Sequence, residues 1–350
     1  MKKITIVVND IAASPGGGLT VLKDFYETVI QRTEDIEWIF LLSKRYVEDT
    51  KNVRVILLPE VKKHFNRILF DFFLGNKLIN KFEPVVVFSL QNTVVYSCKG
   101  KRVTYIHQSL PFQNMKSFSF FKKNEFKLAC IQYLLGSIIK KSINNSYLNI
   151  VQTKWMKKAV EEICSVSNVI QICPNIPSIK YKAYYESTKV FFYPTNNVLY
   201  KNNKLLINAT KRLLQDGVQI KTVITVEGSD KDITFTGRIP IDKVYQYYSS
   251  SCLVFPSYIE TFGYPLVEAR SVGAIILASD CEFSHELLDG YENAYFFNPF
   301  DEIALAKLMK KVAIGIIKRK ESKSVRFEDS LYKNTWDKVI DEILKVALEK

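Results

Sequence analysis

The stretch CLVFPSYIETFGYPLVEARSVGAIILASD (252–280) decides the fold, because it contains one complete structural unit. An apolar run at its start is followed by a polar loop, and a second apolar run occupies 274–278. Pro265 lies between the two runs, and a proline inside a helix costs roughly 3 kcal/mol. At the first turn of a helix the missing N–H of proline costs nothing. We therefore predict a strand, a loop, a helix with Pro265 in its first turn, and a second strand.

The same alternation of apolar runs and helix-like stretches extends along the chain of 350 residues. Several runs are apolar on both faces, which is typical of parallel strands between layers of helices. The runs lie at 4–8, 38–42, 53–58, 85–90, 102–106, 149–152 and 169–173, and then at 190–193, 221–226, 233–237, 252–256, 274–278 and 294–298. The sequence therefore predicts an α/β protein with two doubly wound, Rossmann-like halves. Ligands of such sheets bind beyond the carboxyl ends of the strands, so we expect the two halves to face each other across a ligand-binding cleft.

The segment PNIPSIKYKAYYESTK (174–189) has two prolines three positions apart and no clear periodicity, which indicates a linker. We expect an N-terminal domain over 1–175 and a C-terminal domain over 176–330. Residues 331–350 have an amphipathic helical pattern, and we expect this helix to pack back on the N-terminal domain. Its predicted apolar face consists of Trp336, Val339, Ile343 and Val346.

The composition is that of a globular protein, with a formal net charge of +13. The six cysteines are scattered and show no metal-ligand spacing with the three histidines, as expected of a reduced cytoplasmic protein. No apolar run approaches the roughly 20 residues of a membrane span. Residues 99–158 hold twelve Lys or Arg and one acid, Glu125, so the positive charge is concentrated in this segment.

The loop and helix start within 252–280 combine groups that suit an anionic ligand. Gly263 lets a backbone approach a ligand closely, and a helix N-terminus offers N–H groups and partial positive charge. Glu260 falls in the loop and Glu268 near the first turn of the helix, where carboxylates can accept hydrogen bonds from hydroxyl groups. A diphosphate that carries a diol would satisfy both features. The alternative is a plain strand–loop–helix turn whose glutamate complements the helix dipole, and the residues alone leave the two equal.

The stretch FPSYIETFGYPLVEARSVGAIILASD (255–280) resembles the donor-binding region of the family-4 glycosyltransferases, which are retaining enzymes of the GT-B architecture. The family signature is E-x7-E around F-G-x-P, and Glu260 and Glu268 match its spacing. The resemblance extends over about 190–310 and is weaker in the first half. It implies an acceptor-binding N-terminal domain and a C-terminal domain that binds a nucleotide sugar.

The resemblance also implies roles for single residues. Glu268 would bind the ribose of the nucleotide and Glu260 the transferred sugar, as a catalytic residue. The backbone N–H groups of Phe262, Gly263 and Tyr264 would surround the sugar and diphosphate. Fixed hydrogen-bond donors aimed at the leaving diphosphate are the expected means of stabilising its charge.

Further residues match positions of the family that bind ligands, and each of them can also be explained by a purely structural role. Gly16, Gly17 and Gly18 follow the first strand and would lie near the diphosphate and acceptor; the alternative is a plain turn. His107 would reach the sugar of the donor as a second catalytic residue, although a lone histidine is as often structural.

Lys201 would contact the diphosphate, with Arg238 as a helper, and the alternative for Lys201 is an exposed lysine. The sequence departs from the family here, because Tyr193 and Pro194 replace the usual Gly-Arg. Asp230 and Asp232 form an Asp-x-Asp in a polar loop, where a solvated turn is the expected role. We expect no cofactor and no metal.

A basic segment with phenylalanines, SLPFQNMKSFSFFKKNEFK (109–127), predicts a contact with an anionic membrane. Its candidate side chains are Phe118, Phe120, Phe121 and Phe126 beside Lys116, Lys122, Lys123 and Lys127. The face would receive a lipid-linked acceptor at the inner side of the cytoplasmic membrane. The alternative is a solvated basic face over a core of phenylalanines.

The leading hypothesis is a metal-independent, retaining glycosyltransferase of the hexosyltransferase type. It would move a sugar from a nucleotide-sugar donor to a saccharide or lipid-linked saccharide in cell-surface polysaccharide synthesis. One alternative is a GT-B-fold sugar-nucleotide epimerase, which would use the same cleft without an acceptor. Another is a non-catalytic binder of membranes or nucleic acid, but no nucleic-acid module is visible and we expect no nucleic-acid partner.

Overall fold

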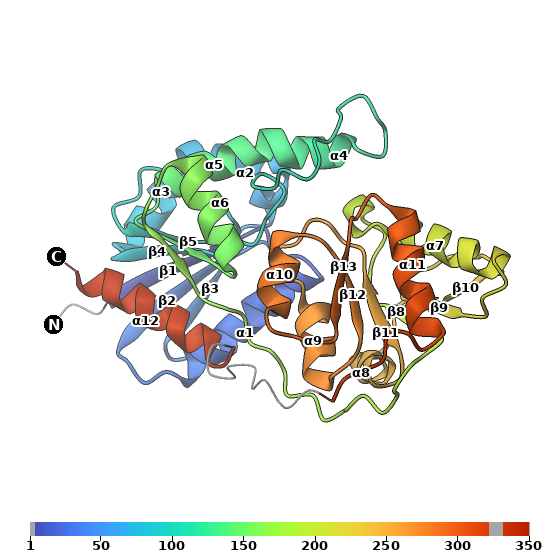
Figure 1. Cartoon of the computed structure of the whole chain (residues 1–350). Coiled ribbons are helices and arrows are strands. Elements are labelled where there is room, and N and C mark those ends of the chain that lie inside the picture. The colour runs from blue at the N-terminus through green and yellow to red at the C-terminus, as the bar shows by residue number, and fades with distance from the viewer. Residues whose placement is uncertain (1–3, 322–331, 350) are drawn as a thin grey trace.

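The computed structural model describes residues 4–321 and 332–349, which form two parallel sheets flanked by helices (Figure 1). The first sheet has seven strands in the order β3-β2-β1-β4-β5-β6-β7. Its strands are β1 (Ile4–Asp10), β2 (Ile36–Leu42), β3 (Val53–Leu57), β4 (Val86–Ser89), β5 (Lys101–Tyr105), β6 (Leu148–Val151) and β7 (Val169–Gln171).

The second sheet has six strands in the order β10-β9-β8-β11-β12-β13. Its strands are β8 (Val190–Tyr193), β9 (Lys221–Ile224), β10 (Ile233–Phe235), β11 (Cys252–Phe255), β12 (Ile276–Ser279) and β13 (Ala294–Phe297). Both orders are doubly wound, and each of the thirteen predicted runs overlaps one of these strands. The predicted fold class is therefore confirmed. The domain limits remain predictions; the segment between β7 and β8 contains no helix or strand, and the limit at 330/331 lies outside the described residues.

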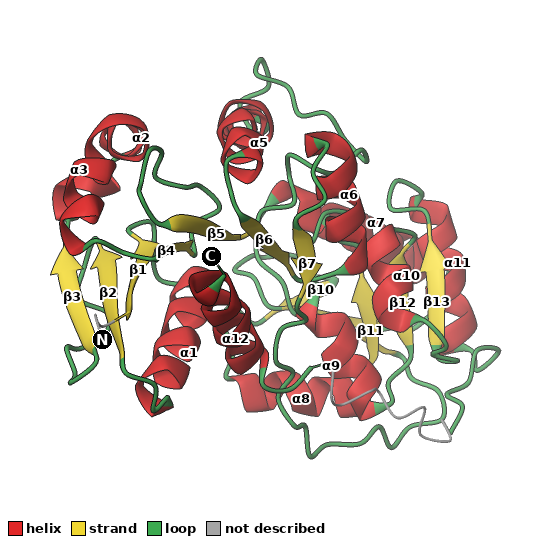
Figure 2. Cartoon of the chain, turned by 90° about the vertical axis from the view of Figure 1, so that its left-hand side faces the viewer, coloured by secondary structure: helices red, strands yellow, loops and turns green. Residues whose placement is uncertain are grey.

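Helices cover both faces of the first sheet, with α1 and α12 on one side and α2, α3 and α5 on the other (Figure 2). The helices of this half are α1 (Gly17–Gln31), α2 (His64–Leu69), α3 (Gly75–Ile79), α4 (Phe126–Ala129), α5 (Gly136–Asn144) and α6 (Lys154–Cys164). Short 3-10 helices are η1 (Pro59–Lys62) and η3 (Asn80–Phe82), and the π-helical turns η2 (Phe70–Leu74) and η4 (Cys130–Leu135) join α2 to α3 and α4 to α5.

The first helical turn of the second half is the 3-10 turn η5 (Leu199–Lys201), and the last helix of the chain returns to the first half. The helices after η5 are α7 (Asn203–Gln215), α8 (Ile241–Ser250), α9 (Tyr264–Val272), α10 (Glu282–Leu288), α11 (Glu302–Ala313) and α12 (Thr335–Leu348). The predicted apolar face of α12 is buried in the same cluster as Phe25 of α1 and Tyr105 of β5. Arg32, at the end of α1, forms ion pairs with Asp337 and Asp341 of this helix.

The segment 109–129, between β5 and the end of α4, crosses to the second half (Figure 1). Leu110, Phe118 and Leu128 are buried in the same apolar cluster as Phe255 of β11. This corrects one expectation, because a Phe118 ring that is 2% exposed cannot insert into a membrane. No helix in the described ranges is long and apolar enough to span a bilayer.

Candidate active site

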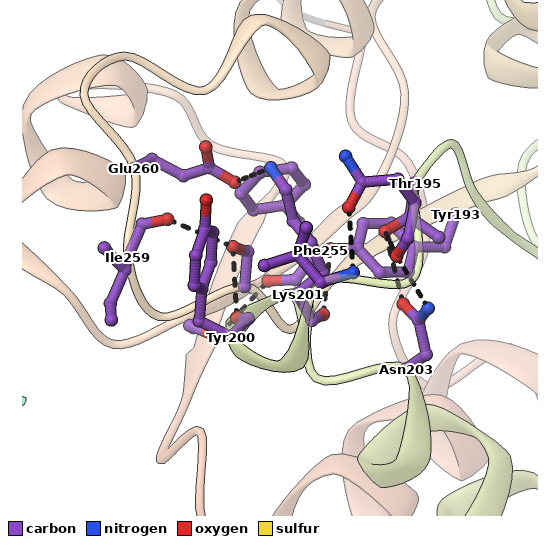
Figure 3. A network of polar contacts seen from close by, with 12 residues as sticks. Tyr193, Thr195, Tyr200, Lys201, Asn203, Phe255, Ile259 and Glu260 are labelled. Carbon is purple, nitrogen blue, oxygen red and sulfur yellow. Dashed lines mark hydrogen bonds and ion pairs between the residues drawn. The ribbon is translucent and has the colours of Figure 1, made fainter. Parts of the chain in front are cut away.

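The site lies where neighbouring strands β8 and β11 lead into helices on opposite sides, which is where doubly wound sheets bind ligands. Hydrogen bonds join the loops that follow these two strands (Figure 3). The Tyr258 N–H, after β11, donates to the Tyr200 carbonyl at 3.2 Å, and so does the Ser257 hydroxyl at 3.3 Å. Within the segment after β8, the Tyr193 hydroxyl donates to the Lys201 carbonyl at 2.9 Å. Lys201 Nζ lies 2.5 Å from Glu260 Oε1, and both side chains are mostly shielded from solvent. The structure thus brings two of the predicted residues into direct contact.

Lys201 owes its position to a tight turn. It ends η5, and Asn202 after it adopts the left-handed conformation, with φ of 59°. Asn tolerates this conformation better than most residues, which explains an Asn where glycine is usual. The Asn202 side chain also donates to the Pro299 carbonyl at 2.7 Å. An ammonium has three N–H groups, so Lys201 can hold Glu260 and still donate to a ligand oxygen.

The α9 helix begins where the sequence predicted. Gly263 is its N-cap with φ of 99°, a conformation that disfavours residues with a side chain, and Pro265 lies in the first turn. The backbone N–H groups of Phe262, Gly263 and Tyr264 have no hydrogen-bond acceptor within the described part of the chain. The Phe262 ring itself is buried in the core. Three unoccupied N–H groups at a helix start form an anion-binding arrangement.

Glu268 lies on α9 and is 8% exposed. Burial raises the pKa of its carboxyl group, while the Tyr248 hydroxyl, which donates to Oε2 at 3.0 Å, acts in the opposite direction. Tyr248 comes from α8, so Glu268 lies between two helices rather than at the surface. Oε1 remains available to accept a hydrogen bond from a ligand hydroxyl.

Two cavities border this region. One of about 770 Å³ is lined from both halves of the molecule, by Phe112, Trp155 and Lys158 of the first and Tyr258, Glu260 and Asp280 of the second. The other, of about 400 Å³, lies at the ends of β8, β9 and β10 and is lined by Thr195, Thr225, Glu227, Arg238 and Val244. Arg238 and Glu260 therefore line different cavities. Val244 lies one turn of α8 before Tyr248, so the smaller cavity adjoins the partner of Glu268.

Gly16, Gly17 and Gly18 occupy the start of α1, at the carboxyl end of β1. Gly16 is the N-cap with φ of 122°, where only glycine is comfortable. All three are exposed, and a Cβ at any of them would have no protein atom within 4 Å. The open space above this loop is compatible with the predicted approach of a ligand.

His107 follows β5 and is held in one tautomer. Asn92 Oδ1 accepts the His107 backbone N–H at 2.7 Å, which places Asn92 Nδ2 3.1 Å from ring Nε2. An amide nitrogen donates, so Nε2 accepts and the ring proton is on Nδ1. Burial, and then Arg67, lowers the pKa of His107 to about 4. Nδ1 is buried and has no partner among the described residues, so the neutral ring has a hydrogen-bond donor to spare.

A buried charged cluster beside His107 was missed by sequence reasoning. Asp10 ends β1 and is 4% exposed; burial raises its pKa to about 7, against the effect of Arg67 and Lys62. Burial also raises the pKa of Asp71 to about 6, against Arg67 and a hydrogen bond from Thr93. The sequence did contain a signal for Asp10, because this acid ends the apolar run VVND (7–10) of the first strand. Arg67 and Asp71 lie on the helical segment 64–74, and only the tertiary fold brings them to Asp10.

Two other predicted positions lie away from the site. Asp230 forms an ion pair with Lys211 at 2.6 Å, as expected of a solvated turn. Of the candidate membrane side chains, Phe120 and Phe121 lie just before α4 and are 39% and 99% exposed, and Phe126, the first residue of α4, is also exposed. Lys122 and Lys123 are exposed beside them.

Residues 175–323 match the model of the family described as "Glycosyl transferases group 1". The O-antigen chain mannosyltransferase RfbU of Salmonella typhimurium is 32% identical over 91 residues, which are 26% of this chain and 25% of RfbU. The alignment thus spans about a quarter of this curated relative.

Solved structures resemble the chain over nearly its full length. Sucrose-phosphate synthase from Thermosynechococcus elongatus has a TM-score of 0.67 at 15% identity, covering 99% of this chain and 97% of that one. The lipopolysaccharide outer core galactosyltransferase WaaB has a TM-score of 0.63 at 15% identity, with coverages of 98% and 99%. HepE of Anabaena, solved in complex with UDP-glucose, has a TM-score of 0.61 at 14% identity, with the same coverages. At these identities the likeness concerns the fold.

The matches support the predicted enzyme class, a glycosyltransferase, and are consistent with a part in cell-surface polysaccharide synthesis. In residues 175–323 the chain matches the group 1 glycosyl transferases, and as a whole it has the GT-B fold of two facing Rossmann-like halves.

Proposed function

We propose that the chain is a retaining, family-4 glycosyltransferase that transfers a sugar from a nucleotide-sugar donor to a saccharide or lipid-linked saccharide. One observation carries the proposal: the three unoccupied N–H groups at Phe262, Gly263 and Tyr264 lie in the loop that presents Glu260 to Lys201. The partial positive charge of the helix start, the Lys201 ammonium and the Glu260 carboxylate thus lie together beyond the carboxyl ends of β8 and β11. The match of residues 175–323 to the group 1 family supports the same conclusion.

The donor would lie along the second half of the molecule. Glu268 would accept a hydrogen bond from the ribose, and the adjoining cavity of about 400 Å³ would hold the base. Lys201 and the α9 N–H groups would hold the diphosphate, with Arg238 at its outer end. These groups supply positive charge without a metal ion, and we propose a metal-independent reaction. HepE, which shares the fold, is solved with UDP-glucose, and this supports a nucleotide sugar as the class of donor.

The chemistry proposed is a front-face displacement. Charge develops on the departing diphosphate as the glycosidic bond breaks, and hydrogen-bond donors already fixed at that position stabilise it without reorganisation. Glu260 would orient the transferred sugar through its hydroxyls, and His107 would approach the sugar from the opposite half. The phosphate oxygen released from the sugar would accept the proton of the acceptor hydroxyl.

The acceptor would enter the cavity of about 770 Å³, because residues of both halves line it and Glu260 is among them. The partial relative RfbU is named as an O-antigen chain mannosyltransferase, which supports a saccharide of a cell-surface polysaccharide as the acceptor class. The protein would then act in the cytoplasm, where nucleotide sugars are available.

A thermal-shift panel of nucleoside diphosphates and nucleotide sugars tests the proposal. A ligand at a hundredfold excess over its dissociation constant stabilises the folded state by about 2.7 kcal/mol, so binding is readily detected. Turnover is then measured with and without saccharide acceptors, because an epimerase would convert the nucleotide sugar alone. We expect transfer by the wild type and none by Glu260→Ala; full transfer by Glu260→Ala would refute the assignment.

We further propose that the exposed face around Phe121 contacts an anionic membrane and brings a lipid-linked acceptor to the cleft. The phenyl ring of Phe121 is almost fully exposed to solvent, and two exposed lysines, Lys122 and Lys123, follow it in the chain. Each lysine near an anionic leaflet contributes about 1 kcal/mol. The double variant Lys122→Glu/Lys123→Glu should therefore lose most flotation with anionic liposomes. Lys310→Glu/Lys311→Glu on α11 reverses the same charges elsewhere and should still float; equal losses in both variants would contradict a specific membrane face.

A further inference from the structure

The N-terminus of α6 is capped by a carboxylate from the other half of the molecule. The first N–H groups of a helix have no acceptor within the helix. The N–H groups of Lys154 and Trp155 donate to Glu286 Oε1 at 2.7 Å and Oε2 at 3.0 Å. Glu286 belongs to α10 of the second half, so one carboxylate binds two backbone N–H groups across the boundary between the halves.

The electrostatics favour this contact. A carboxylate at a helix N-terminus is stabilised by the helix dipole, and hydrogen bonds to an ionised group are about twice as strong as those between neutral groups. Burial raises the pKa of Glu286, while the two N–H groups oppose that rise. Gln171 Nε2 lies 3.4 Å from Oε1 and adds a third donor from the first half.

A second hydrogen bond reaches the site from the same helix end. Thr153, the N-cap of α6, donates its hydroxyl to the carbonyl of Thr261 at 3.0 Å and accepts the Met156 N–H at 3.4 Å. Thr261 lies between Glu260 and Phe262. The start of α6 is therefore bonded both to α10 and to the loop that holds the candidate catalytic carboxylate.

We propose that Glu286 and Thr153 form a latch between the two halves that positions loop 260–263 for reaction. Glu286 holds α6 against the second half, and Thr153 then fixes the Thr261 carbonyl next to Glu260. Both act as positioning residues, because they act through the loop and need not touch a substrate. Loss of the latch would leave the binding of a nucleotide by the second half intact but would misplace the loop relative to the first half. The kinetic part of this inference rests on the proposed function, whereas the latch itself does not.

Hydrogen–deuterium exchange of the unliganded chain tests the latch directly. Glu286→Gln keeps the shape but replaces one acceptor oxygen by a donor, and Thr153→Val removes the hydroxyl. Both variants should exchange faster in the peptides that cover 153–157 and 260–264. The loss of a charge-assisted hydrogen bond predicts an increase of about tenfold to a hundredfold. The control is Glu292→Gln, an exposed glutamate of the second half whose ion pair with Lys320 stays within that half, and it should exchange like the wild type. Unchanged exchange in both latch variants would overturn the proposal.

Kinetics separate positioning from a merely structural role. With any nucleotide sugar that the wild type turns over, we expect kcat of Glu286→Gln to fall about tenfold to a hundredfold while nucleoside diphosphate affinity stays within about twofold. An unchanged kcat would show that the latch does not position the loop. If the wild type turns over no donor, the proposed function fails, and the exchange experiment still decides the latch. Should Glu286→Gln not fold, Glu286→Asp keeps the charge but shortens the reach, and the same two readouts apply.

Discussion

Glu268 shows how a single buried carboxylate can serve a ligand. Tyr248 donates to its Oε2, and Oε1 remains to accept a hydrogen bond from the hydroxyl of the proposed ribose. We expect Glu268→Ala to weaken nucleoside diphosphate binding about tenfold to a hundredfold, the usual value of a hydrogen bond to a charged group. Titration calorimetry measures this loss. Tyr248→Phe, which leaves the carboxylate in place, should bind nearly as well as the wild type; undiminished binding by Glu268→Ala would contradict the ribose role.

The lowered pKa of His107 predicts how the stability of the folded chain depends on pH. The pKa of the ring in the folded chain is about 4, below the ordinary value of 6.5, because desolvation, and then the positive charge of Arg67, disfavours the protonated ring. Between these two values the unfolded chain takes up a proton that the folded chain does not, so stability falls as the pH falls through this window. Asp10 and Asp71, whose pKa values are raised, act in the opposite direction, so the measurement must compare variants.

The comparison uses urea unfolding of the wild type and His107→Gln at about pH 7 and about pH 5. The wild type should lose stability relative to the variant at the lower pH. A constant difference between the two proteins would show that the ring takes up its proton equally in the folded and unfolded chains, so that its pKa is not lowered by folding.

At the scale of the element, the two glycines of α9 allow the effect of backbone strain to be measured apart from the effect on ligand binding. Gly263 and Gly273 lie at its two ends, with φ of 99° and 85°. Alanine at either position should lower stability by about 1–2 kcal/mol, the cost of left-handed backbone for a residue with a Cβ. Only Gly263→Ala should also weaken diphosphate binding, because it displaces the N–H groups of the helix start. Denaturation and calorimetry on both variants measure the two effects; equal affinities would place the diphosphate elsewhere.

Most elements were predictable because their causes are local. The strands are short apolar runs, and the start of α9 follows from the backbone demands of Gly263 and Pro265. The crossing segment 109–129 was not predictable in the same way. Its phenylalanines look alike in sequence, yet Phe118 is buried against the second half and Phe121 faces solvent, because burial depends on which surface a neighbouring domain covers.

At the scale of the whole molecule, the last helix, α12, packs on the first half. Trp336 packs edge-on against Phe25, with ring centroids 5.5 Å apart, and lies 5.3 Å from the ring of Tyr105. We expect Trp336→Ala to cost about 3–5 kcal/mol of unfolding free energy, as for other buried large-to-small changes. Leu348→Ala at the exposed end of the same helix should change stability by less than about 0.5 kcal/mol. Urea unfolding measures both changes. Similar small losses of unfolding free energy in the two variants would mean that α12 contributes little to the stability of the first half.

The two doubly wound halves, the loop that carries Glu260, and the helix with Pro265 in its first turn could all be predicted from the sequence. These follow from the period of apolar residues and from the conformational limits of glycine and proline, which act over a few neighbouring residues. Only the tertiary structure decided that Lys201 meets Glu260, that Asp10 and Asp71 lie with Arg67, and that Glu286 caps α6. Lys201 and Glu260 are 59 positions apart, Asp10 is far along the chain from both Arg67 and Asp71, and Glu286 and α6 belong to different halves. The energy of such contacts comes from burial and from complementary charge, which depend on how the sheets place their loops and not on any local pattern.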